Sequence, residues 1–336
     1  MNEAIALARM AWGRTNPNPM VGAVVVNPDG KIIGRGFHPR AGEAHAEVNA
    51  IRDALKRTGS CRGCTIYVTL EPCCTTGRTP PCTQAIIENG FSKVVVGALD
   101  PNPRHAGRGI KVLEAAGIKC VTGVCNEECI DLNRPFFKYI STGKPFVILK
   151  MAMTLDGKIA TPGGSSKWIT GPEARGRVQQ LRRLADAIMV GGNTLRLDHP
   201  GLTVRDPENW SPQPRRLILS NAMSEEEIQA FFPDGRAEKV CPDTPEEGDK
   251  LMTRLGSEEC MVLLIEGGGE VADAALKAGV VDYVEFHIAP MLLGGRESIP
   301  VLGGGDPGAL ADALRLRQVK VTMYGSDIAV SGFTKE

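Results

Sequence analysis

Three cysteines crowd into the stretch from Leu70 to Cys82, LEPCCTTGRTPPC, and His45 lies upstream in the short motif His-Ala-Glu. Cysteine thiolates and a neutral histidine ring are ligands that zinc prefers. Three protein ligands leave a fourth position for water, whereas a structural site closes all four. Two thiolates would reduce the acidifying effect of the metal, so a separate base is needed, and Glu47 can be that base. The first half of the chain therefore contains a candidate zinc site.

The local structure limits how these residues can meet. Positions i and i+2 of a regular helix lie about 200° apart, so His45 and Glu47 can face one site only at the first turn. Gly42, just upstream, is compatible with such an entry into the helix. The two prolines before Cys82 are typical of a helix start. Free N–H groups at a helix N-terminus stabilise a thiolate, so Cys82 would benefit there.

The order of the motifs points to a family. His-x-Glu, then Pro-Cys, then a later Cys resembles the signature of zinc-dependent nucleobase deaminases. The common spacing there is Pro-Cys-x-x-Cys, but Cys73 and Cys82 are nine positions apart. This expanded loop, with NPNPMVGAVVV, GEAHAEVNA, TLEPC and DPNPRHAGRGI, resembles the bifunctional deaminase/reductase of riboflavin biosynthesis. The resemblance covers nearly the whole chain.

The resemblance implies roles for residues of the first half. The zinc ligands that it implies are His45, Cys73 and Cys82, and the proton carrier is Glu47. The residues implied to contact the substrate, a phosphoribosylated diaminopyrimidinone, are Asn18, His38 and Arg78. One position departs from the family, because Thr75 stands where most members have a histidine. A hydroxyl can hydrogen-bond but cannot become cationic. The alternative prediction is therefore a reductase alone, with a weakened deaminase site.

The other cysteines are interpreted as structural. Cys61 and Cys64 form a C-x-x-C motif that lies after a helix and before a strand, the reverse of a redox motif, with no second pair at ribbon spacing. Adjacent side chains of an extended segment point to opposite sides, so we expect Cys74 to face away from the metal. The sequence assigns no role to the other five, which are Cys120, Cys125, Cys129, Cys241 and Cys260.

A glycine-rich segment marks the second half. The half has no G-x-G-x-x-G after a strand, so a Rossmann nucleotide site is not indicated. Instead, in VLLIEGGGEVADAAL a strand runs through Glu266 into three glycines and a helix. Consecutive glycines at a helix start let backbone N–H groups approach a phosphate. Three glycines can also be a plain turn, and VGGNT at 190–194 repeats the pattern more weakly.

The same family resembles dihydrofolate reductase in its C-terminal domain. The stretches LKMAMTLDGKIA, SSKWITG, GGNTLRLDHPGLTVR and IEGGGEVADAAL match it in order. The resemblance implies that NADPH gives a hydride that reduces the ribosyl side chain to ribityl. Residues implied to hold NADPH are Ala152, Trp168, Thr194, Asp198, Ser220, Gly268, Gly269, Glu270, Val271, Ala272, Asp273 and Ala274. Residues implied to hold the substrate are Ser166, Arg182, Leu202, Arg205 and Glu266, of which the two arginines suit a sugar phosphate.

Strand and helix patterns alternate along the chain. We predict a hairpin at residues 21–37. We also predict strands at 65–70, 93–99 and 118–124, and helices at 45–57 and 107–117. Around 133–143 we expect a break, after which 144–160 restarts the pattern. Thr170 with Glu173 predicts a capping box at a helix start. Further strands are expected at 186–192, 215–220, 260–269 and 280–295, with a final hairpin at 318–333, whereas 206–256 gives no clear pattern.

This alternation favours α/β sheets with helices on both faces. We predict a cytidine-deaminase-like three-layer domain at residues 1–143, the zinc-dependent pyrimidine deaminase. A dihydrofolate-reductase-like domain follows at residues 144–336, the NADPH-dependent reductase.

Charge and hydropathy exclude other classes. Lys plus Arg and Asp plus Glu both number 39, which argues against duplex binding and against the rival reading, an RNA-binding protein on a deaminase scaffold. No apolar run approaches the roughly 18 to 20 residues of a membrane helix. The N-terminus is typical of an amphipathic helix rather than a signal peptide. We expect a cytoplasmic homo-oligomer with reduced cysteines, acting on a small molecule, with no nucleic-acid or membrane partner.

Overall fold

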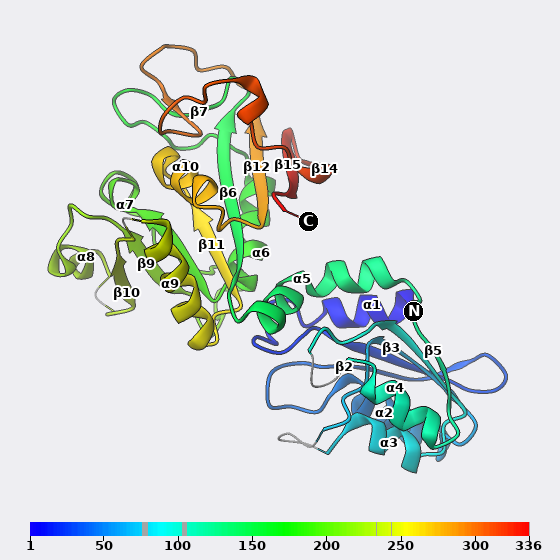
Figure 1. Cartoon of the computed structure of the whole chain (residues 1–336). Helices are drawn as coiled ribbons and strands as arrows, with labels where there is room; N and C mark the ends of the chain where they lie inside the picture. Colours follow the sequence, from blue (N-terminus) through cyan, green and yellow to red (C-terminus); the bar gives the residue numbers. More distant parts are fainter. Residues whose placement is uncertain (76–79, 103–105, 233, 243, 336) are drawn as a thin grey trace. The chain divides into compact units, whose positions relative to one another are not determined.

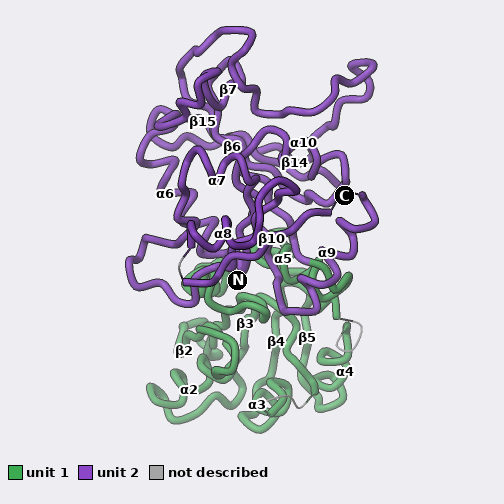
Figure 2. The backbone as a smooth tube through the Cα atoms, turned by 90° about the vertical axis from the view of Figure 1, so that its left-hand side faces the viewer, with its two compact units in different colours: residues 1–144 green, residues 145–336 purple. Residues whose placement is uncertain are grey.

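The structure is a computed structural model that describes every residue except 76–79, 103–105, 233, 243 and 336. The chain divides into two units, residues 1–144 and 145–336 (Figure 2). Each unit has its own sheet with helices packed against it (Figure 1). The predicted α/β class is therefore confirmed.

The first unit is built on a five-stranded sheet in the order β2-β1-β3-β4-β5. Strand β1 is antiparallel to β2 and β3, while β3, β4 and β5 run parallel. Helices α1 and α5 cover one face, and α2, α3 and α4 cover the other, so the unit has three layers (Figure 1). The elements are α1 (Asn2–Arg9), β1 (Gly22–Val26), β2 (Ile32–Phe37), α2 (Ala46–Thr58), β3 (Thr65–Leu70), α3 (Cys82–Glu88), β4 (Lys93–Ala98), α4 (Arg108–Ala115), β5 (Lys119–Val121) and α5 (Asn126–Thr142).

Helix α2 lies very close to β2 because two glycines leave room for it. A Cβ atom on Gly36 would lie 2.3 Å from the backbone nitrogen of Ala50 and 2.4 Å from the carbonyl oxygen of Ala46. A Cβ atom on Gly34 would meet the Ala50 carbonyl at 2.3 Å. On the helix side the facing residues are fully buried alanines. Backbone therefore packs on backbone, which fixes where the first turn of α2 lies.

The segment expected to break between the two domains is instead a helix. Helix α5 continues to Thr142 and ends at Gly143, which has a left-handed conformation. Inside the helix, Asn133 leaves helical geometry and Pro135 follows it. Proline removes one helical hydrogen bond and kinks the helix, and this kink explains why the helical pattern looks interrupted in the sequence.

The second unit is built on an eight-stranded sheet in the order β10-β9-β8-β11-β6-β12-β15-β14. The first six strands of this order run parallel, and β15 and β14 are antiparallel to their neighbours. The elements are β6 (Phe146–Thr154), β7 (Lys158–Ala160), α6 (Pro172–Leu184), β8 (Ala187–Gly191), α7 (Gly192–Asp198), β9 (Arg215–Leu219), α8 (Glu225–Phe231), β10 (Ala237–Val240), α9 (Pro245–Ser257), β11 (Val262–Glu266), α10 (Gly269–Lys277), β12 (Tyr283–Ala289), β13 (Ile299–Pro300), the 3-10 helix η1 (Leu310–Asp312), β14 (Arg317–Tyr324) and β15 (Asp327–Phe333).

The two faces of this sheet differ in chemistry. Helices α9 and α10 pack on the apolar face formed by alternate residues of β6, β8 and β11. On the opposite face, Arg177 of α6 makes a bidentate ion pair with Glu285 of β12 at 3.0 and 2.9 Å. Burial alone would raise the pKa of Glu285, but hydrogen bonds from His287 and Arg177 lower it to about 2. Helix α6 is thus held partly by buried charge.

The predicted capping box at Thr170 is wrong. Helix α6 begins one residue later, with Gly171 as N-cap and Pro172 in the first turn, and no side chain caps it from within. Instead the Gly171 N–H donates to a carboxylate oxygen of Asp327, at 2.6 Å, from the distant strand β15. The carboxylate of Asp327, distant in the sequence, therefore caps the helix in place of the predicted local motif.

Among the described helices, none is long and apolar enough to cross a membrane.

We predict that Gly36→Ala destabilises the protein by about 1–3 kcal/mol, because the new methyl group would overlap backbone atoms of α2. The measurement is the urea-unfolding midpoint. The matched control is Gly248→Ala in α9, where a Cβ would meet nothing within 4 Å, so that stability should stay level or rise by up to about 1 kcal/mol. Equal behaviour of the two variants would contradict the close packing.

Candidate active sites

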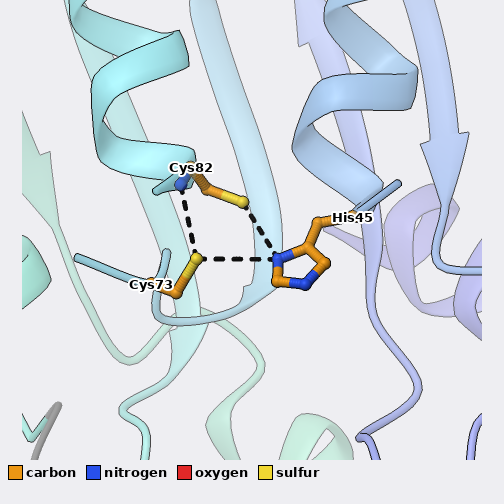
Figure 3. A group of neighbouring side chains, drawn as sticks. All are labelled: His45, Cys73 and Cys82. Carbon is orange, nitrogen blue, oxygen red and sulfur yellow. Dashed lines mark hydrogen bonds between the residues drawn. The ribbon is translucent and has the colours of Figure 1, made fainter. Parts of the chain in front are cut away.

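Three side chains from separate segments of the first unit meet in one small group (Figure 3). His45 is the N-cap of α2, Cys73 lies in the loop after β3, and Cys82 is the first residue of α3. The His45 Nδ1 atom lies 3.2 Å from the Cys82 sulfur and 3.6 Å from the Cys73 sulfur. All three ligand atoms lie within 4.8 Å of one another. One imidazole nitrogen and two sulfurs make a donor set that fits zinc.

The two sulfurs of this group are tightly linked. The backbone N–H of Cys82 donates to the Cys73 sulfur at 3.3 Å. Hydrogen bonding from the Cys82 thiol is the main cause that lowers the pKa of Cys73 to about 4. The same contact raises the pKa of Cys82. The protonation of the two sulfurs is therefore linked, and a bound divalent cation would favour the thiolate form of both.

Glu47 lies beside this group and is almost completely buried, with 3% of its surface exposed. It occupies the first turn of α2, as the spacing from His45 requires. Burial, and then the negative charge on Cys73, raise the pKa of Glu47 to about 7. A carboxyl group with this pKa can take up and return a proton near neutral pH.

Asn18 and His38 form a polar pair next to the metal group. His38 Nδ1 lies 3.2 Å from the carbonyl oxygen of Ala44, so this nitrogen carries the proton and donates. His38 Nε2 is then the acceptor for the Asn18 side-chain N–H, at 3.1 Å. Burial lowers the pKa of His38, so its ring is neutral. The Asn18 amide is thereby oriented with its oxygen as the remaining acceptor.

Three sequence predictions concern the loop between the metal ligands Cys73 and Cys82. Arg78 lies outside the described residues. Thr75 is exposed at a bend that precedes them. Cys74 does not belong to the metal-binding group, and burial, followed by the negative charge of Glu71, raises the pKa of its thiol.

Glu71 is a buried residue of the first unit that sequence reasoning missed. Its carboxylate accepts backbone N–H groups of Gly107 and Gly109, both at 2.9 Å, at the start of α4. A carboxylate at a helix N-terminus is favourable, and Glu71 directly precedes the metal loop. The TLEPC motif contained this residue, but nothing in the sequence indicated that its partner was a loop near residue 107.

The second unit contains a cavity of about 960 Å³ at the carboxyl ends of β8, β9 and β11, bounded by α6, α7 and α10. Parallel α/β sheets bind ligands at this edge. Most of the predicted cofactor and substrate residues line it, namely Ala152, Ser166, Trp168, Arg182, Thr194, Asp198, Leu202, Arg205, Ser220, Glu266, Gly268, Gly269, Glu270, Val271 and Ala274. Two predicted residues do not line it: Ala272 is fully buried in the core, and Asp273 pairs with Lys277 at 2.8 Å.

Two hydrogen bonds order one wall of this cavity. The Ser166 hydroxyl donates to an Asp198 carboxylate oxygen at 2.7 Å, so Ser166 presents its lone pairs to the cavity. The Lys167 ammonium donates to the Asp198 backbone carbonyl at 2.6 Å. Asp198, a predicted cofactor residue, is therefore in direct contact with Ser166, a predicted substrate residue.

Arg182 and Glu266 form a bidentate pair across the cavity floor. The guanidinium donates to the two carboxylate oxygens at 2.6 and 2.8 Å, and both side chains are nearly buried. Burial alone would raise the pKa of Glu266, but the charge and hydrogen bonds of Arg182 outweigh this effect. The pKa of Glu266 is therefore lowered, and its carboxylate stays ionised. Because Arg182 is committed to Glu266, Arg205, which has no ion pair among the described residues, is the arginine better placed for a phosphate.

Lys150 also lines the cavity, and sequence reasoning missed it. It is 8% exposed, and burial lowers its pKa against the raising effect of Glu266. A single charged residue inside the apolar strand Phe146–Thr154 was the available signal.

Trp168 is 66% exposed at the cavity, and the Arg175 guanidinium lies 4.7 Å from its ring centroid. Trp168 is therefore not a core residue.

We predict that Cys73→Ser removes zinc from the purified protein, because a serine hydroxyl stays protonated near neutral pH and is a poor zinc ligand. Atomic absorption on dialysed protein measures the zinc content. The matched control is the adjacent Cys74→Ser, which should keep the zinc content of the parent protein. Loss of zinc from both variants, or from neither, would contradict the assignment of the group.

Models of known families match both units. Residues 1–98 match the cytidine and deoxycytidylate deaminase zinc-binding region, and residues 145–330 match the RibD C-terminal domain. A riboflavin biosynthesis protein RibD of Actinobacillus pleuropneumoniae is 41% identical over 98% of this chain and 93% of its own length. That of Escherichia coli is 37% identical over 98% of this chain and 97% of its own.

Solved structures give the same result. RibD of Acinetobacter baumannii superposes with a TM-score of 0.87 at 36% identity, covering 100% of this chain and 98% of the other. A diaminohydroxyphosphoribosylaminopyrimidine deaminase/5-amino-6-(5-phosphoribosylamino)uracil reductase of Thermotoga maritima also gives 0.87 at 36% identity, covering 98% and 96%. These matches confirm the resemblance predicted from the sequence, and the chain belongs to the RibD family of riboflavin biosynthesis proteins.

Proposed function

We propose that the chain catalyses two successive steps of riboflavin biosynthesis. The first unit hydrolytically deaminates a phosphoribosylated diaminopyrimidinone, and the second reduces the ribosyl side chain of the product to ribityl with NADPH. The observation that carries this proposal is the metal-binding group of His45, Cys73 and Cys82 with the buried Glu47 beside it. The cavity of the second unit, lined by the predicted cofactor residues, supports the second step.

Glu47 is the proton carrier of the proposed deamination. Zinc, when bound to the three ligands, supplies the Lewis acidity that makes water nucleophilic near neutral pH. The carboxylate of Glu47 takes one proton from water and gives it to the ring nitrogen as the water oxygen bonds to the ring carbon. It then takes the remaining proton of the added hydroxyl and gives it to the amine, whose bond to carbon breaks. Water and the amino-pyrimidine become a carbonyl and ammonia. The raised pKa of Glu47 suits both halves of this transfer.

Asn18 and His38 orient the pyrimidine in this proposal. The Asn18 oxygen, fixed by the contact with His38, accepts a hydrogen bond from a ring or exocyclic N–H. His38 is neutral and buried, so it acts through Asn18 rather than as a charge. The contact from Arg78 to the substrate stays a prediction from the resemblance.

The proposed reductase site divides its tasks among three groups. NADPH, when bound, supplies the hydride, and the backbone N–H groups around Gly268 and Gly269 suit its phosphates. Arg205 holds the substrate phosphate through charge-assisted hydrogen bonds. Glu266, held in one orientation by Arg182, accepts hydrogen bonds from the substrate.

The alternative of a reductase without deaminase activity rests on Thr75. Thr75 is not a member of the metal-binding group, whose residues lie at the starts of α2 and α3 and in the loop after β3, and Glu47 lies in the first turn of α2. We therefore favour two activities. Thr75 would affect substrate contact and not the binding of the metal.

We predict that Glu47→Gln lowers the rate of ammonia release by about 100-fold or more, because the amide cannot carry the proton. Zinc content should be unchanged, since Glu47 is not one of the ligands. NADPH oxidation on the deaminated substrate should also be unchanged. Ammonia release at the rate of the parent enzyme would remove Glu47 from the mechanism.

We predict that Arg205→Ala raises the KM for the deaminated substrate by about tenfold or more, through loss of a phosphate contact. The KM for NADPH should stay the same. The control is Arg196→Ala, which breaks an exposed ion pair with Glu227 and should change neither constant. An unchanged substrate KM in Arg205→Ala would refute the assigned phosphate site.

For the assembly, we propose a homo-oligomer formed along β14. This strand ends the eight-stranded sheet, and Val319, Val321 and Met323 on it are 53%, 66% and 59% exposed. Exposed apolar edge strands are templates for pairing with another strand. We predict that Val321→Lys lowers the mass measured by light scattering to that of a monomer, whereas Val112→Lys, on the surface of α4, leaves it unchanged. A monomeric parent protein would refute this interface.

For the location we keep the expectation of the cytoplasm. All ten cysteines are free thiols in the structure. This fits a reducing compartment.

A further inference from the structure

In each unit, a side-chain amide hydrogen-bonds both backbone groups of one residue close to predicted substrate residues. In the first unit, Asn133 of α5 accepts the backbone N–H of Met20 at 2.8 Å and donates to the Met20 carbonyl at 2.8 Å. Asn133 is 2% exposed, and it lies at the kink where α5 leaves helical geometry. Asn18, a predicted substrate residue, lies two positions before Met20.

In the second unit, Gln213 holds Val204 in the same way. Its oxygen accepts the Val204 N–H at 2.8 Å, and its nitrogen donates to the Val204 carbonyl at 3.0 Å. The same nitrogen also donates to the Trp210 carbonyl at 3.0 Å. Val204 lies between Leu202 and Arg205, two predicted substrate residues that line the cavity.

Both held segments lack strand and helix. Residues 199–205 have no regular structure, yet Leu202 and Val204 are only 1% and 2% exposed. Buried backbone groups need partners, and side chains supply them here. Arg182 donates to the Thr203 carbonyl at 3.0 Å, and Gln179 accepts the Arg205 N–H at 2.7 Å. An amide carries a donor and an acceptor side by side, so it can replace a neighbouring strand.

We propose that Asn133 and Gln213 are positioning residues, Asn133 for the deaminase segment that carries Asn18 and Gln213 for the reductase segment that carries Leu202 and Arg205. This proposal rests on the proposed function. Each amide fixes the backbone from which a substrate-binding side chain extends. Small errors in such a backbone cost substrate binding even when the fold persists.

The informative substitutions are Asn133→Asp and Gln213→Glu. Each keeps the shape of the side chain and keeps an acceptor for the backbone N–H. Each loses the donor and brings a carboxylate oxygen against a backbone carbonyl oxygen. Packing stays the same, so the effect reports on the hydrogen bond.

The experiment measures both activities on both variants. Asn133→Asp should raise the KM for the deaminase substrate by about tenfold and leave the reductase constants unchanged. Gln213→Glu should raise the KM for the deaminated substrate by about tenfold, with the KM for NADPH and the deaminase constants unchanged. Zinc content should match that of the parent protein in both variants.

Two control variants carry the same chemical change where no site residue depends on it. Asn89 at the end of α3 donates to the Ala85 carbonyl at 2.8 Å, and Gln229 in α8 donates to the Ala237 carbonyl at 2.7 Å. Asn89→Asp and Gln229→Glu should lower Tm without changing any KM. A second readout is pH: when the carboxyl group introduced by Gln213→Glu is protonated it regains a donor, so its KM defect should shrink as pH falls.

The proposal is overturned if Asn133→Asp and Gln213→Glu lower only Tm and the active fraction, with every KM unchanged. It is also overturned if each variant affects both activities equally, since that reports general destabilisation. Failure of the proposed function looks different, because the parent protein itself would then release no ammonia and oxidise no NADPH.

Discussion

The contact of α2 with β2 is the constraint on which the metal centre depends. His45 and Glu47 can face one site only at a helix start, and that start is fixed because the backbone of α2 lies directly on Gly34 and Gly36. The same seating buries Glu47, and burial raises its pKa to about 7. Cys82 reaches the group from a second helix start and Cys73 from the loop after β3. Packing therefore fixes where the ligands lie and, by burying Glu47, raises the pKa of the base.

The second unit reaches its chemistry by a different arrangement. Its parallel strands end at one edge, and the cavity lies there between α6, α7 and α10. Buried charges are paired, Arg182 with Glu266 at the cavity and Arg177 with Glu285 between α6 and the sheet. Unpaired, these groups would be costly to bury. The segment that carries Arg205 has no regular structure, so side chains such as Gln213 must hold it in place.

Local patterns in the sequence predicted most strands and the hairpin of β1 and β2, and the resemblance to the deaminase signature implied the group of His45, Cys73 and Cys82. They did so because short motifs at element ends determine these features. The capping box at Thr170 failed because a distant residue, Asp327, takes over the cap. The helical nature of 133–143 was obscured by Pro135. Lys150, Glu71, Asn133 and Gln213 were missed because their partners lie far away in the chain, and one sequence does not show such pairs.

The central claim is that one chain performs deamination first and reduction second, each with its own cofactor. The most direct measurement is mass spectrometry of the product from the phosphoribosylated diaminopyrimidinone, with zinc removed or NADPH omitted in turn. Omitting NADPH should stop the reaction at the deaminated ribosyl compound, and removing zinc should leave the substrate unchanged even with NADPH present. A ribityl product formed without zinc, or no deaminated product with zinc present, would contradict the account.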